Sequence, residues 1–204
     1  NDHIGGLPAF FFFFHKAKVI LSSEIPGAEY ASVRRYLYSI TGNVDFQKHG
    51  DRFVFIKEDS YVDGIHVYSH LAHHHAQPLG DRMLLIKSDD GKFVKDAFRH
   101  ELAFVVGDVL FTGCAHNGIL NILESIQEPV RLSIGGFHLL DSHLSEHYET
   151  DEQLRDISSE LARRYPDMDF YTGHCTGEHC YGVLSEEKGL QLHQFHCGDE
   201  IGIG

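Results

Sequence analysis

The stretch LFTGCAHNGI, residues 110–119, carries the most structural information in this sequence. Its apolar start predicts a strand, Thr-Gly ends that strand, and a helical pattern begins at residue 117. Cys114 and His116 stand two residues apart, and in extended backbone such residues point to the same side. Thiolate and imidazole are the ligands that zinc prefers. The stretch therefore predicts a metal site at a strand end. The alternative is a buried cysteine beside a helix-capping histidine.

Other predicted strands also end beside a histidine. In FYTGHCTG, residues 170–177, a short strand delivers His174 between a glycine and a cysteine. In NDHIGG, residues 1–6, Asp2 and His3 are adjacent, and the two glycines permit a turn tight enough for both to reach one ion. His138 follows the strand 130–134, and His100 opens the strand 101–106; for each of these two alone, a structural role is the favoured interpretation.

The elements expected along the chain alternate between strands and helices, which is typical of a layered α/β (α+β) domain. Strand ends of such folds meet at one edge, where sites form. The apolar segment 7–14 predicts a helix covered on most sides, and residues 28–37 predict a second helix. Further strands are expected at 18–21, 52–56, 64–67, 83–86, 109–112, 169–172 and 190–195, further helices at 117–126, 151–165 and 178–184, and a loop at 70–80.

The composition predicts one domain over residues 1–204. Thirty acidic residues against seventeen basic ones give a net charge of −13, which argues against a nucleic-acid surface because such surfaces neutralise phosphates with Lys and Arg. The longest apolar run is too short to cross a bilayer. Four cysteines in a chain of this size do not indicate a disulfide framework, so reduced thiols in a cytoplasmic protein are expected. Seventeen histidines favour metal binding.

Taken together, the motifs resemble those of the metallo-β-lactamase superfamily. DHIGGL, residues 2–7, resembles the second half of the superfamily's His-x-His-x-Asp-His motif. The combination TGCAHNGI, GGFHL and GHCTG is similar to the branch described as 7,8-dihydropterin-6-methyl-4-(β-D-ribofuranosyl)aminobenzene-5'-phosphate synthase-like proteins or metal-dependent hydrolases. The resemblance implies an αββα sandwich whose N-terminal strands, with the His-x-His pair, are missing from this chain; a truncated chain is therefore expected.

The resemblance also implies a ligand set for two metal ions, with zinc expected and iron or manganese as alternatives. Asp2, His3 and His174 would hold one ion, with Cys114 or His116 sharing or bridging it. His100 would take the third histidine position and, with the missing His-x-His pair, hold the other ion. Asp2 and His138 are the predicted catalytic residues, and His138 is expected to donate a proton to the leaving group.

The predicted function is that of a metal-dependent hydrolase, in which a metal-activated water attacks a phosphoester or a lactone-type ester of a small molecule. The full-length protein is expected to be the active enzyme, and this part of it alone is expected to be inactive. No nucleic-acid or membrane partner is expected. The alternative is a catalytically incomplete protein of the same fold that binds a ligand or partner. A small structural zinc site from Cys175, His179 and Cys180 is a third possibility, but it needs a fourth ligand.

Overall fold

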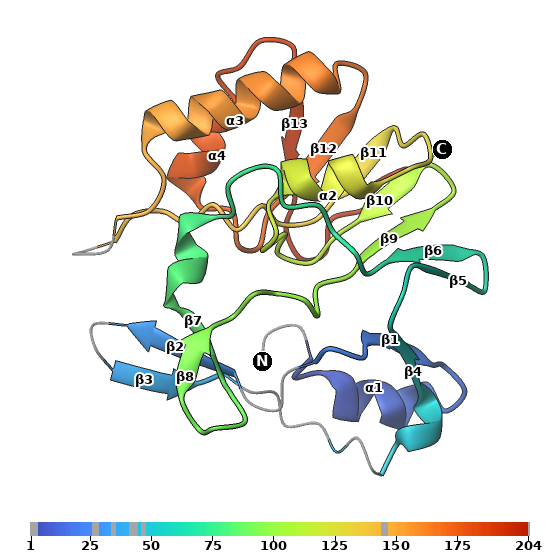
Figure 1. The fold of residues 1–204 in the computed structure, drawn as a ribbon. Coiled ribbons are helices and arrows are strands. Elements are labelled where there is room, and N and C mark those ends of the chain that lie inside the picture. The colour runs from blue at the N-terminus through green and yellow to red at the C-terminus, as the bar shows by residue number, and fades with distance from the viewer. Residues whose placement is uncertain are drawn as a thin grey trace. The chain divides into compact units, whose positions relative to one another are not determined.

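The computed structural model describes residues 4–25, 29–33, 36–40, 45, 48–143 and 147–203. The chain forms two compact units, one made of Asn1–Glu58 and Asp81–His100, the other of Asp59–Gly80 and Glu101–Gly204. Figure 1 shows the helices and strands of both units. The single domain expected from the sequence stays a prediction.

The first unit contains one helix and two small sheets. Strands β1 and β4 pair in parallel, and four antiparallel strands follow the order β3-β2-β7-β8. The elements of this unit are α1 (Leu7–Phe13), β1 (Val19–Ser22), β2 (Glu29–Val33), β3 (Tyr36–Ser39), the 3-10 turn η1 (Gly50–Arg52), β4 (Phe53–Ile56), β7 (Leu84–Lys87) and β8 (Phe93–Lys95). A further 3-10 turn, η2 (Leu79–Met83), spans the boundary between the units.

Two expectations for this unit are wrong. The helix expected over residues 28–37 is instead the antiparallel pair β2–β3, in which Tyr30 faces Ser39 and Val33 faces Tyr36. Aromatic and β-branched residues fit a pleated surface better than a helix, and cross-strand pairing decides between the two. Helix α1 forms as expected but is not covered on most sides, because Phe12 and Phe13 are each 70% exposed. A short helix buries only one of its faces.

The second unit is built on a seven-stranded sheet with the order β13-β12-β11-β10-β9-β6-β5. Strands β10 to β13 run parallel to one another, whereas β9, β6 and β5 are antiparallel to their neighbours. The elements of this unit are β5 (Ser60–Val62), β6 (Ile65–Tyr68), β9 (Ala103–Val106), β10 (Val109–Phe111), α2 (Ile119–Ser125), β11 (Leu132–Ile134), α3 (Asp151–Arg164), β12 (Asp169–Thr172), α4 (Glu178–Leu184) and β13 (Gln191–Gln194).

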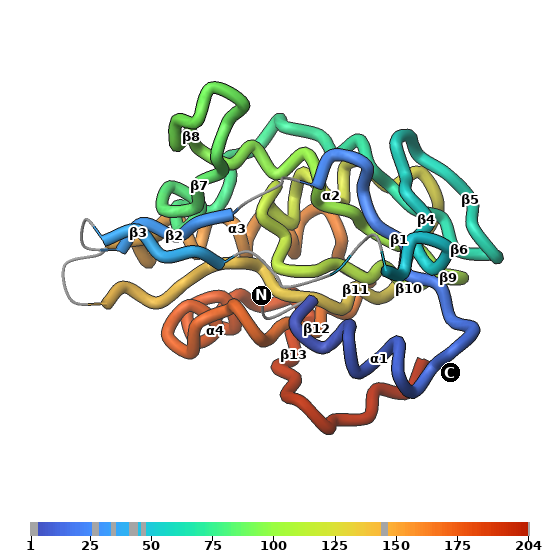
Figure 2. The backbone as a smooth tube through the Cα atoms, turned by 90° about the horizontal axis from the view of Figure 1, so that it is seen from below, coloured from blue at the N-terminus to red at the C-terminus, as the bar shows by residue number. Residues whose placement is uncertain are grey.

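The core of this unit lies between the sheet and its helices. Leu154 and Leu161 of α3 and Leu184 of α4 are fully buried against sheet residues such as Phe170. Figure 1 shows α3 and α4 beside strands β12 and β13. After β13 the chain returns along the path that Figure 2 traces to the C-terminus, where the Ile203 carbonyl accepts a hydrogen bond of 2.8 Å from Arg131.

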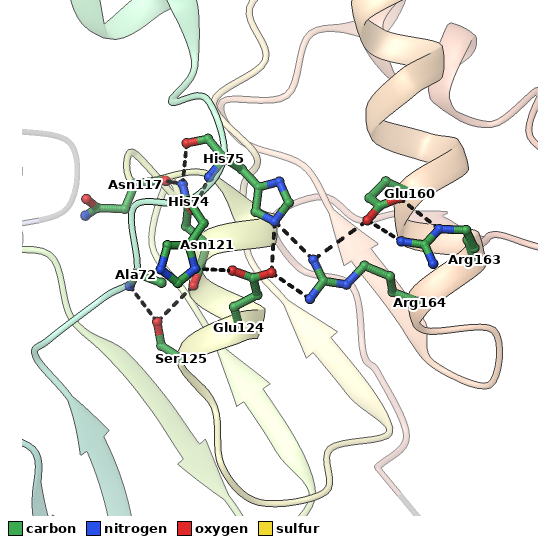
Figure 3. Close-up of polar contacts among 10 residues, drawn as sticks. All are labelled: Ala72, His74, His75, Asn117, Asn121, Glu124, Ser125, Glu160, Arg163 and Arg164. Carbon is green, nitrogen blue, oxygen red and sulfur yellow. Dashed lines mark hydrogen bonds and ion pairs between the residues drawn. The ribbon is translucent and has the colours of Figure 1, made fainter.

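Residues 70–78 have no regular structure, as expected for the loop 70–80, whereas residues 79 and 80 begin the turn η2. Side chains of α2 hold the loop in place (Figure 3). The Ala72 N–H donates to the Ser125 hydroxyl at 2.8 Å. Asn121 is fully buried; its carbonyl oxygen accepts from the His75 N–H at 2.8 Å and its amide donates to the His75 carbonyl at 2.9 Å. The backbone groups of Ala72 and His75, which lack a strand or helix partner, are thus satisfied by side chains of α2.

Glu124 joins this loop to helix α3. Its carboxylate lies 2.8 Å from His74 Nδ1, 3.0 Å from His75 Nε2 and 2.6 Å from Arg164 Nη2, and Arg164 also pairs with Glu160 (Figure 3). Hydrogen bonds from His75, His74 and Arg164 lower the pKa of Glu124 from 4.5 to about 2. The carboxylate is solvent-accessible, so salt screens part of this attraction.

We expect Glu124 to contribute to the pH dependence of stability. A carboxyl whose pKa is lowered on folding stabilises the fold above its unfolded-state pKa, and this contribution disappears as the pH falls from 4.5 to about 2. Glu124→Gln should therefore flatten the plot of unfolding free energy against pH in that window, as measured by urea denaturation. Glu152→Gln, at an exposed position of α3, is the control. An unchanged slope for Glu124→Gln would contradict this role.

Part of the chain's sequence is apolar, but none of the helices among the described residues is long and apolar enough to cross a membrane.

Candidate metal centre

Three loops leave the carboxyl ends of the neighbouring parallel strands β10, β11 and β12, and backbone hydrogen bonds join them. The Gly136 N–H donates to the Gly113 carbonyl at 2.8 Å, and the Gly135 N–H donates to the Tyr171 carbonyl at 3.0 Å. The Gly177 N–H donates to the Leu139 carbonyl at 2.8 Å. The three histidine-bearing motifs of the sequence therefore lie side by side at one edge of the sheet, as expected for strand ends in layered folds.

Each of these loops contains a residue with a positive φ that is not glycine. The φ angles are 60° at Ala115, 49° at His138 and 55° at His174. A residue with a Cβ in the left-handed region costs about 1–2 kcal/mol, and such residues gather at functional sites because the surrounding structure holds them there. The backbone conformation at all three loops is therefore maintained by the packing and hydrogen bonds of this edge.

The loops bring Cys114, His116 and His138 together, so that one donor atom of each lies within 4.8 Å of the others. The two imidazole rings are 4.2 Å apart between centroids. Cys114 and His138 are buried and His116 is half-buried. One thiol and two imidazoles at this separation match the donor types that zinc takes in proteins, so the residues present fit a metal ion.

Cys175 adjoins this group from the third loop. Its thiol lies 3.6 Å from the Cys114 carbonyl oxygen. A hydrogen bond with the Cys114 side chain lowers the pKa of Cys175 to about 4, against the effect of burial, and His138 adds to the lowering. The site therefore favours the thiolate form of Cys175, which is the form that binds metals.

Glu101 fixes the backbone that carries His116. Its carboxylate is buried and accepts hydrogen bonds of 2.7 Å from the N–H groups of His116 and Asn117 and from the Asn117 side-chain amide. A carboxylate that accepts several hydrogen bonds from one turn holds that turn in a single conformation. Glu101 is a positioning residue that the sequence did not single out, although it directly follows His100.

The other predicted ligands lie elsewhere. Asp2 and His3 are outside the described residues. His100 lies in the other unit, where Glu29, Asp96 and His100 form a separate group of metal-binding residue types with donor atoms within 4.8 Å. His174 follows β12 on the same edge as Cys114 but is exposed and is not part of the three-residue group.

Two members of the alternative structural zinc site have other partners. The His179 ring lies 2.8 Å from an Asp151 carboxylate oxygen, and the Cys180 thiol donates to the Leu140 carbonyl at 3.5 Å. Burial raises the pKa of Cys180 to about 12, and hydrogen bonding to Asp141 adds to this increase, which disfavours a thiolate. All four cysteines lie in the described part of the chain, and none forms a disulfide.

A cavity of about 470 Å³ lies between the loop 75–79, the start of α2 and helix α3. Phe137, Leu139 and Ile157 contribute to its mostly apolar wall. Cys114, His116 and His138 are not among the residues that line it, so the cavity and the donor group are separate features of this unit.

Comparison with known proteins identifies the fold. No family model matches the chain. The crystal structure of Tm1679, described as a metal-dependent hydrolase of the beta-lactamase superfamily, matches with a TM-score of 0.71 over 93% of this chain and 73% of that chain, at 21% identity. The chain has the metallo-β-lactamase fold. The fold expected from the motifs is confirmed.

Two curated relatives come from Methanocaldococcus jannaschii. One is an uncharacterised protein, MJ0448, 31% identical over 119 residues that make up 56% of this chain and 41% of that protein. The other is named 7,8-dihydropterin-6-methyl-4-(beta-D-ribofuranosyl)-aminobenzene-5'-phosphate synthase, 28% identical over 126 residues, 57% of this chain and 40% of that protein. The matched segments span about two fifths of each relative. The similarity to the branch expected from the motifs is confirmed.

Replacing Glu101 tests how this metallo-β-lactamase-fold chain positions His116. In Glu101→Gln, an amide NH2 group replaces one carboxylate oxygen. The N–H group that donated to this oxygen then faces another donor and lacks an acceptor. We expect the free energy of unfolding to fall by about 1–3 kcal/mol and zinc affinity to fall about 10–100-fold. Chemical denaturation and zinc titration measure the two effects. The exposed Glu200→Gln is the control, and wild-type stability in Glu101→Gln would refute the role.

Proposed function

We propose that this chain belongs to a metal-dependent hydrolase that acts on a phosphoester or a lactone-type ester of a small molecule. The observation that carries the proposal is the group of Cys114, His116 and His138 at the carboxyl ends of parallel strands in a metallo-β-lactamase fold. The solved neighbour is itself described as a metal-dependent hydrolase, which supports the reaction class.

Zinc is the proposed metal, and two ions are proposed for the whole protein. A zinc ion at such a site supplies a Lewis acid and lowers the pKa of a water molecule toward neutrality. Cys114 and His116 are proposed as its ligands. Asp2, His3, His174 and His100 remain proposed ligands from the motif resemblance, and Asp2 and His138 remain the proposed catalytic residues.

His138 has two possible roles in this proposal. Its imidazole is buried within the donor group, which supports a role as a metal ligand. An imidazole so close to the reacting centre is also suited to hold the proton that the leaving group takes, as the sequence predicts. The metal content of a protein that lacks the His138 imidazole distinguishes the two roles, because only the loss of a ligand weakens metal binding directly.

The substrate class is proposed from the hydrolytic chemistry of a metal-activated water and from the name of the relative described as a dihydropterin phosphate synthase. That name favours a phosphorylated compound for the relative, and we extend this preference to the present protein. The net charge of −13 disfavours a large polyanion, so a small phosphorylated substrate is proposed.

The test uses protein produced from the complete gene and reconstituted with zinc. Elemental analysis gives the metal content, and turnover is measured with bis(p-nitrophenyl) phosphate, p-nitrophenyl phosphate and a homoserine lactone. We expect bound zinc and measurable turnover, and His116→Ala should lower turnover at least about 100-fold together with metal content, because a direct ligand matters no less than its supporting residues. The exposed His196→Ala is the matched control. A protein that binds no metal and shows no turnover would instead indicate a ligand-binding module.

His138→Ala separates the two roles of that residue. Loss of bound zinc would identify His138 as a ligand, whereas retained zinc with reduced turnover would identify it as the proton donor. Unchanged turnover with intact zinc content would contradict both roles.

A further inference from the structure

Cys175 is held against the donor group, although the sequence assigns the neighbouring His174 to the metal. The Cys175 thiol donates to the Cys114 carbonyl at 3.6 Å, and Cys114 and His138 are its neighbours. It is half-buried, whereas His174 is exposed. The third loop therefore turns the sulfur of Cys175, and not the imidazole of His174, toward Cys114 and His138.

The glycine at position 136 makes this approach possible. A Cβ atom at Gly136 would collide with the Cys175 sulfur, and it would lie 3.5 Å from the Cα atom of Cys114. The second loop thus leaves room for the thiol of the third loop beside Cys114. Any side chain at Gly136 would push Cys175 away from the group.

The three grouped donors leave one position of a tetrahedral zinc ion to be filled. Cys175 lies outside the set in which every donor atom is within 4.8 Å of every other. Its sulfur lies 3.6 Å from the Cys114 carbonyl oxygen and turns about a single side-chain bond, so it can move relative to the three donors without a change of the backbone.

We propose that Cys175 is the fourth ligand of the ion held by Cys114, His116 and His138, and that it closes this metal site in the resting protein. The proposal rests on the metal centre of the proposed function, with His138 in its role as a ligand. When zinc binds, two Zn–S bonds form; both sulfurs bind as thiolates, and a proton carried by either thiol goes to solvent. A site with four protein ligands has no open position, whereas a catalytic zinc keeps one for water or substrate. Cys175 must therefore leave the ion before an external molecule can bind it.

X-ray absorption at the zinc edge counts the sulfur ligands directly. We expect two sulfur atoms at about 2.3 Å and two nitrogen atoms at about 2.0–2.1 Å in protein loaded with one equivalent of zinc. Cys175→Ser should lower the sulfur count from two to one, and Cys197→Ser, which changes an exposed cysteine, should leave it at two. Circular dichroism and a thermal melt establish that each variant is folded.

Alkylation provides a readout that needs no variant. Zinc should protect two cysteines of the unaltered protein, Cys114 and Cys175, from iodoacetamide, as located by peptide mass spectrometry. Cys197 should react at the same rate with and without zinc. Protection of Cys114 alone would overturn the proposal even if Cys175→Ser failed to fold.

Cobalt substitution tests whether Cys175 closes the site. In protein loaded with one equivalent of cobalt, added azide should leave the visible spectrum unchanged, because this site has no open coordination position. In Cys175→Ser, azide should shift the spectrum. An azide response of equal size in both proteins would overturn the closure.

The outcomes distinguish this inference from the proposed function. One sulfur ligand in the unaltered protein, with loss of a nitrogen ligand in His174→Ala, would assign the fourth position to His174 and overturn the inference while leaving the hydrolase proposal intact. Failure of the protein to bind zinc or cobalt at all would instead overturn the metal centre on which both depend.

Discussion

The parallel alignment of β10, β11 and β12, and the backbone hydrogen bonds that join the loops after them, are the constraint on which the candidate metal centre depends. The bonds from Gly136 to Gly113 and from Gly177 to Leu139 hold three loops that are far apart in sequence at one edge of the sheet. Side chains on separate loops can share an ion only if the backbones beneath them are fixed to within a fraction of an ångström. Here the sheet and these bonds supply that precision.

The conformational cost of this arrangement is concentrated at the same edge. Ala115, His138 and His174 each adopt a left-handed backbone conformation that side-chain-bearing residues avoid. Glu101 offsets part of this cost at the first loop, because its buried carboxylate binds two consecutive N–H groups beside Ala115. In the second unit, the core of sheet and helices therefore supports three loops with strained backbone conformations. This arrangement is common in folds that carry their sites on loops.

Sequence patterns predicted the second unit well because its elements have strong local signals. The strand 169–172 is observed as β12, and the predicted helix 151–165 is observed as α3. A capping box of Thr150 and Gln153 begins α3, and its amphipathic pattern is clear. The segment 28–37 failed because its aromatic and aliphatic residues suit either a helix or a strand over so short a length, and pairing with β7 favours the strand. Local patterns do not contain that information.

The sequence by itself determined the chemistry that this chain can offer: thiol and imidazole groups after three strands, glycines that permit close approach, and motifs typical of the metallo-β-lactamase fold. Only the tertiary structure decided which of these groups meet. It brings His138 into contact with His116, directs Cys175 toward Cys114 while His174 stays exposed, and buries Glu101 beneath the His116 turn. Strand register and loop conformation set the direction of each side chain, and both arise from hydrogen bonds between segments distant in the sequence.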